Sequence, residues 1–164
     1  MSTIEKKSLA VGKYVSTKHV DTVIRTYKQE RWVYNSERLG KADSLSGWLS
    51  VEEIEAFIEN IKLHGADGIR FYFGVYPQDD APIPEYAGRQ TIVLAATKQK
   101  QTEDGTTNKD VYITKDGSSV ILAYNSLYIC PPWCGGGSAF KPGSELSGIG
   151  VALIDKGEKG LEVI

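Results

Sequence analysis

The chain has 164 residues, of which 41% are hydrophobic and 24% are charged, and its formal net charge is −2 at pH 7. A chain of this length and composition can bury a core of its own without a disulfide framework or a structural metal. The near balance of charge argues against a dedicated nucleic-acid-binding protein, which needs a basic face to displace counterions from phosphates.

No apolar run approaches the ~20 residues that a membrane helix requires. Residues 1–7 carry mixed charge, and no apolar stretch of the kind found in a secretory signal follows them. The sequence therefore predicts a soluble, cytoplasmic protein that makes no contact with a membrane.

The first predicted helix covers residues 17–31. Ser16 is a suitable N-cap residue, and the apolar residues after it recur at the spacing of one helical stripe. That stripe comprises Val20, Val23, Ile24 and Tyr27. Residues 32–34 predict a short extended piece, and the serines and glycines of residues 35–47 predict a loop.

The second predicted helix begins after Ser50. Ser50 and Glu53 have the S-x-x-E spacing of a capping box, and Leu49 and Ile54 have the spacing of a hydrophobic staple. Gly65 is suited to the left-handed backbone conformation that ends many helices. The sequence thus marks both ends of this helix.

Strand patterns follow the second helix. Residues 69–76 alternate in the manner of a half-buried strand, and residues 91–97 are apolar on both faces, as in a central strand. Asp116-Gly117 is a strong hairpin-turn signal. The remaining expectations are loops at 77–88 and 99–109, hairpin strands at 111–114 and 120–124, and a short strand at 127–130.

Helices that precede strands predict an α+β fold rather than a wound parallel sheet. We expect two N-terminal helices packed on a mainly antiparallel sheet of about three to five strands. Residues 1–134 are expected to form a single domain with a core from about residue 14. Residues 135–164 are expected to form an irregular Gly/Pro-rich C-terminal segment that is either flexible or contributes an edge strand.

Cys130 and Cys134 are the candidate redox or metal site. Their C-x₃-C spacing is one residue longer than that of a thioredoxin-like pair, and glycines follow them instead of a helix. Zinc normally has four ligands, and only His19 and His64 could supply the typical others, although carboxylates could complete a site. A local disulfide and a pair of ordinary thiols in a rigid Pro-Pro loop are the alternatives.

Arg70, Tyr72 and Tyr76 are the candidate binding residues, because strand alternation places them on one face of residues 69–76. Tyrosine and arginine are typical of interaction hot spots. An RNA-recognition strand would need a glycine after its basic residue, whereas Phe71 follows Arg70 here. Ordinary packing of tyrosines on a sheet face is the alternative.

Signals for catalysis are weak. The sequence has two histidines and lacks the G-x-S-x-G and H-E-x-x-H motifs. Asp79 and Asp80 remain candidate carboxylates for an enzyme. The leading hypothesis is a small non-enzymatic binding or adaptor protein without a cofactor, whose partner is another protein. The alternative is a thiol- or metal-dependent protein that uses Cys130 and Cys134.

Several segments together resemble a family of small bacterial proteins of unknown function. That family carries a G-I-R-[IF]-Y-F-G strand and a late C-P-P-x-C segment. The resemblance covers about residues 48–134, implies a bacterial source and implies no activity. It rests on residues 48–53 (WLSVEE), 68–74 (GIRFYFG), 91–94 (TIVL) and 130–134 (CPPWC).

Overall fold

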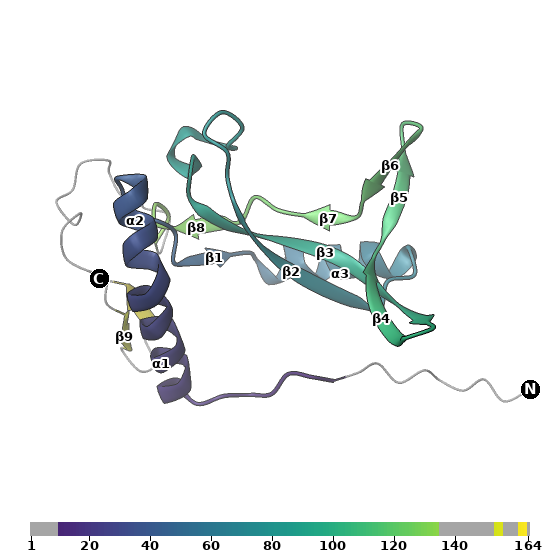
Figure 1. Ribbon diagram of the computed structural model, residues 1–164, viewed down its shortest axis with the longest axis horizontal. Coiled ribbons are helices and arrows are strands. Elements are labelled where there is room, and N and C mark those ends of the chain that lie inside the picture. Colours follow the sequence, from purple (N-terminus) through teal and green to yellow (C-terminus); the bar gives the residue numbers. More distant parts are fainter. Residues whose placement is uncertain (1–9, 135–152, 156–160, 164) are drawn as a thin grey trace, which may run out of the picture.

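The computed structural model describes residues 10–134, 153–155 and 161–163 (Figure 1). These residues have the predicted α+β fold: a long N-terminal helix and a shorter helix are packed with a mainly antiparallel sheet. In this described part of the chain, no helix is long and apolar enough to cross a membrane.

The N-terminal helix is longer than predicted. It runs without a break through α1 (Thr17–Tyr27), the π-helical turn η1 (Lys28–Trp32) and α2 (Val33–Leu39). Ser16 caps its start as expected, since its hydroxyl oxygen accepts the N–H of His19. The extended piece expected at residues 32–34 is wrong, because the buried indole of Trp32 holds this segment against Asp43 as part of the helix. The helix ends at Gly40, whose φ of 72° is left-handed.

Helix α3 (Val51–Leu63) has the predicted ends. The side chain of Ser50 accepts the N–H of Glu53, and the carboxylate of Glu53 accepts the N–H of Ser50, which completes the capping box. Gly65 follows the helix with a φ of 74°. The buried side chains of Phe57 and Ile61 face the sheet.

The main sheet has four strands, all paired antiparallel. β3 is central: β2 lies along one side of it, and β4 and β7 pair with different parts of its other side. In Figure 1, α3 lies behind this sheet. The strands are β2 (Gly68–Val75), β3 (Gln90–Thr102), β4 (Gly105–Asp110) and β7 (Ala123–Tyr124).

The main core lies between α3 and this sheet. Phe57 and Ile61 pack there with Leu94 and Ala96 of β3, and the ring of Phe57 lies 5.6 Å from that of Tyr124. Burial of these side chains, at roughly 25 cal/mol per Å² of apolar surface, provides the main stabilisation of the α3–sheet contact.

The polar loop predicted at residues 99–109 is wrong. β3 continues to Thr102 and turns into β4, so that Thr102 pairs with Gly105 and Thr97 with Asp110. Main-chain hydrogen bonds can pair two strands whose side chains are mostly polar, because those side chains stay in water. The turn contains Asp104-Gly105, a hairpin signal of the same kind as Asp116-Gly117.

Smaller paired segments complete the fold. Asp116 and Gly117 turn the chain with positive φ values between β5 and β6, as expected. A buried cluster of Tyr76, Tyr86 and Ile129 lies beyond the end of β2. The remaining elements are β1 (Ser46–Trp48) with β8 (Tyr128–Cys130), β5 (Tyr112–Lys115) with β6 (Ser118–Ile121), β9 (Leu153–Asp155) with β10 (Leu161–Val163), and the 3₁₀ turn η2 (Pro84–Tyr86). The rest of the Gly-rich segment expected at 135–164 lies outside the described residues.

Candidate functional site

Strand β2 forms an open edge of the main sheet. It pairs with β3 over its whole length, from Gly68 with Thr97 to Val75 with Gln90, and within the described residues it has no neighbour on its other side. An edge strand presents a row of main-chain donors and acceptors that another strand can pair with. The orientation of these groups therefore decides what the edge can bind.

The hydrogen bonds of β3 show which residues of β2 direct their main chain outward. Ala96, the register partner of Ile69, donates its N–H to Leu122 and accepts the N–H of Val111, both away from β2. Hydrogen-bonded and non-hydrogen-bonded pairs alternate along an antiparallel ladder. Outward N–H and C=O groups therefore belong to Ile69, Phe71, Phe73 and Val75.

The same alternate residues expose apolar side chains. Phe71 is 58% exposed, Phe73 80% and Val75 59%, whereas Ile69 is partly buried against the core. Of these four residues in the strand predicted to be half-buried, only Ile69 packs against the core. The reason is that the side chains of α3 pack over β3 and β7, as the Phe57–Tyr124 contact shows, and leave the rest of β2 uncovered.

The opposite face of β2 carries Arg70 and Tyr72, which meet Asp110 across β3. Arg70 Nη1 lies 2.6 Å from Asp110 Oδ1 and 3.0 Å from the Tyr72 hydroxyl oxygen. The Tyr72 hydroxyl donates to Asp110 Oδ2, and Arg70 Nη2 donates to the carbonyl oxygen of Asn108. The hydrogen bond with Tyr72 and the charge of Asp110 raise the pKa of Arg70. These polar groups therefore already have partners within the chain.

The structure separates Tyr76 from the other two candidate binding residues. Tyr76 lies one residue past β2, where it is buried, stacks on Tyr86 at 5.6 Å and donates its hydroxyl to Asn125 Oδ1 at 2.9 Å. Arg70 and Tyr72 thus lie together on the sheet face, and Tyr76 is a core residue.

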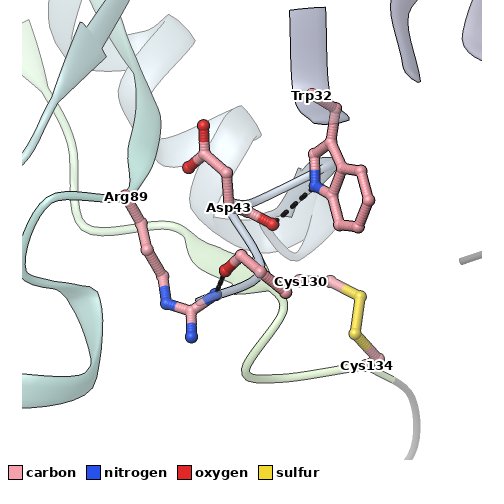
Figure 2. Close-up of a disulfide and its surroundings, with 6 residues drawn as sticks. Trp32, Asp43, Arg89, Cys130 and Cys134 are labelled. Carbon is pink, nitrogen blue, oxygen red and sulfur yellow. Dashed lines mark hydrogen bonds between the residues drawn. A yellow bond between two sulfur atoms is a disulfide. The ribbon is translucent and has the colours of Figure 1, made fainter. Parts of the chain in front are cut away.

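Cys130 and Cys134 are joined in a disulfide, with 4.9 Å between their Cα atoms (Figure 2). Cys130 is buried at the end of β8, where its carbonyl oxygen accepts the N–H of Leu45 at 2.6 Å, and Cys134 is half-buried. A disulfide leaves neither sulfur as a thiolate ligand. Among the described residues, no three or more His, Cys, Asp and Glu side chains are grouped so that they could hold a metal ion.

Buried polar residues hold the main chain near this disulfide. Trp32 Nε1 donates to the carbonyl oxygen of Asp43 at 2.7 Å (Figure 2). The guanidinium of Arg89 donates to the main-chain oxygens of Ala42 and Glu85. Burial lowers the pKa of Arg89, and the nearby charge of Asp43 partly opposes this effect. These contacts fix the loop after α2 against the start of β3.

The sequence predicted β2 and placed candidate contact residues on the face that carries Arg70 and Tyr72, whereas the exposure of the apolar residues on its other face was not foreseen. The alternation of residues 69–76 indicated a strand, yet the same pattern is produced by a strand that is covered and by one that lies uncovered at an edge. Asp110, which binds both Arg70 and Tyr72, lies between the loop predicted at 99–109 and the strand predicted at 111–114. The contact of Asp110 with Arg70 and Tyr72 could be predicted only if the pairing of β3 with β4 were already known.

Comparison of the chain with models of known protein families, with curated proteins and with solved structures finds no match.

Proposed function

We propose that the protein is a non-enzymatic binding protein that contacts a protein partner through the open edge of β2. The observation that carries this proposal is the exposure of Phe71, Phe73 and Val75 on a strand whose outward main-chain groups belong to the same residues. Main-chain hydrogen bonds supply affinity when a strand is added to a sheet edge, and alternate side chains supply specificity. The partner would present an extended segment with apolar residues on one face.

The composition of this edge supports binding. Natural edge strands are usually protected by lysine, proline or a bulge, because exposed apolar edges associate with other strands. β2 has neither lysine nor proline, and its one charge, Arg70, is directed across the sheet to Asp110. β4, by contrast, carries Thr106, Asn108 and Lys109. An edge of the β2 type is expected where it is covered by a partner.

Quantitative mass spectrometry of proteins that co-purify with the tagged chain from its source tests this function. Phe73→Lys should remove the specific partners, because it places a charge in the centre of the apolar surface. Tyr112→Lys is the matched control, since Tyr112 is 62% exposed on the separate β5–β6 hairpin. Equal recovery of all partners by wild type and Phe73→Lys would remove the basis of the proposal.

The disulfide favours a second candidate function, thiol–disulfide exchange. A thiolate of a reductant or partner protein would attack the half-buried Cys134, form a mixed disulfide with it and release Cys130 as the thiolate. In the cytoplasm, bridges of this kind are kept reduced unless they take part in exchange, whereas in an oxidising compartment a structural bridge is ordinary.

Trapping distinguishes these alternatives. Cys130→Ser removes the thiol that would resolve a mixed disulfide on Cys134. An exchange protein with this substitution should therefore accumulate disulfide-linked partners, and the Cys134→Ser variant should not. If neither variant traps a partner and the wild-type bridge stays oxidised in the cell, the bridge is structural.

A further inference from the structure

The open edge of β2 is complementary to itself. We propose that its partner is a second copy of this chain, paired antiparallel through β2 about a two-fold axis at Tyr72. This inference rests on the proposed function of β2 as a contact surface and names the partner that occupies it.

Hydrogen-bond geometry selects one register. Outward main-chain groups lie at Ile69, Phe71, Phe73 and Val75, and partners in an antiparallel ladder must both direct their groups toward each other. With Tyr72 opposite its own copy, Phe71 pairs with Phe73 of the other chain and Ile69 pairs with Val75. Every outward group of these residues then has a partner.

Neighbouring registers leave groups unpaired. A shift that sets Phe71 opposite itself places Val75 against Asp67, whose N–H is already donated to Thr97. A shift in the other direction places Ile69 against Pro77, which has no N–H to donate. Only the register centred on Tyr72 uses the whole outward row.

The side chains on both faces of β2 are compatible with this register. A two-fold axis perpendicular to the sheet keeps like faces together, so the exposed rings of Phe71 and Phe73 form aromatic cross-strand pairs. On the opposite face, Arg70 lies beside Gly74 of the second copy, which has no side chain to collide with it. This register places no like charges opposite each other across the two copies of β2, and Asp110 of the same chain already neutralises Arg70.

Paired charge substitutions test the register. Sedimentation of the full chain at about 100 µM should give twice the 18.0 kDa mass of one chain. Phe71→Lys and Phe73→Glu should each raise the dissociation constant by about tenfold or more, because each removes both symmetry-related contacts between Phe71 and Phe73 and adds a charge that must lose water in the interface. An equimolar mixture of the two should form a heterodimer, detected by native mass spectrometry, because the new lysine lies opposite the new glutamate.

Controls separate this inference from the proposed function. Tyr112→Glu should remain dimeric, and far-UV circular dichroism should show that all variants, changed at exposed positions, keep the fold. A monomeric wild type, a dimer that survives both single substitutions, or a mixture that forms no heterodimer would each overturn pairing with a second copy in this register. A monomer whose Phe73→Lys variant still loses its co-purifying partners would overturn only the self-pairing and leave the proposed function standing.

Discussion

Arg70 and Asp110 belong to the two strands that flank β3, and their side chains meet across it with 2.6 Å between Nη1 and Oδ1. This contact passes over the buried residues Ala95 and Thr97, the register partners of Arg70 and Asp110. The small side chains of β3 leave room for the longer ones from both sides. The sheet therefore has a polar link on the face opposite α3.

Asp110→Ala should loosen this link. Arg70 and Tyr72 would lose a shared acceptor, and since Arg70 is partly exposed, water would replace some of the lost interaction. We expect the melting temperature to fall by about 2–4 °C. In differential scanning calorimetry the Arg70→Ala/Asp110→Ala double variant should lose less than the sum of the single losses. Lys109→Ala, at the neighbouring position of β4, is the control, and additive losses would contradict the link.

Ser50→Ala should destabilise the protein by about 1 kcal/mol, because it removes the side-chain cap of α3. Urea unfolding at neutral pH measures this change. Glu52→Ala, in the same first turn but outside the reciprocal cap, is a suitable comparison. A loss no larger than that of Glu52→Ala would show that the cap is dispensable.

The ionised carboxylate of Glu53 makes the stabilisation by this cap depend on pH. Hydrogen bonds from the Ser50 N–H, the Tyr124 hydroxyl and the Ser50 hydroxyl lower its pKa. A carboxyl whose folded pKa is lowered stabilises the fold above its unfolded pKa, and this stabilisation is lost as the pH falls through the folded pKa. NMR titration should show that Tyr124→Phe and Ser50→Ala each raise the pKa of Glu53 part of the way to its ordinary value. An unchanged pKa in both variants would contradict these contacts.

Trp32→Phe should cost about 1–3 kcal/mol, because the buried carbonyl oxygen of Asp43 would lose its indole donor. Chemical denaturation followed by circular dichroism measures the difference. Tyr34→Phe, on the exposed side of α2, should be close to neutral. A Trp32→Phe variant as stable as Tyr34→Phe would mean that another donor or water satisfies that oxygen.

Reduction of Cys130–Cys134 should lower the stability by about 2 kcal/mol, because the bridge closes only a short loop. The fold should persist, since Ile129 stays buried with Tyr76 and Tyr86 and β8 stays paired with β1. Thermal unfolding with and without a phosphine reductant provides the test. Global unfolding of the reduced protein at room temperature would contradict this expectation.

Elements with local signals could be predicted from the sequence. The reciprocal cap of Ser50 and Glu53, the turn at Asp116-Gly117 and the start of α1 at Ser16 depend on residues within a few positions of one another. The stabilisation of these caps and turns therefore depends on short stretches of sequence. The α+β class followed from the order of such elements.

Elements decided by distant contacts could not be predicted in this way. α2 continues through residues of ordinary strand propensity because Trp32 is anchored at Asp43, and β4 forms from polar residues because β3 extends to meet it. The exposure of Phe71 and Phe73 depends on where α3 lies across the sheet. Burial of Tyr76 likewise depends on Tyr86 and Ile129, which come later in the chain.

The pairing of β1 with β8 has a consequence for how the chain is made. Ser46 of β1 is the register partner of Cys130 of β8, so β1 is synthesised long before β8. Until the ribosome has released the later strand, the loop anchored by Trp32 has no partner for Leu45, and the early segments cannot finish folding. During this interval the main-chain groups of β1 are without their strand partner, and a non-native strand could pair with them.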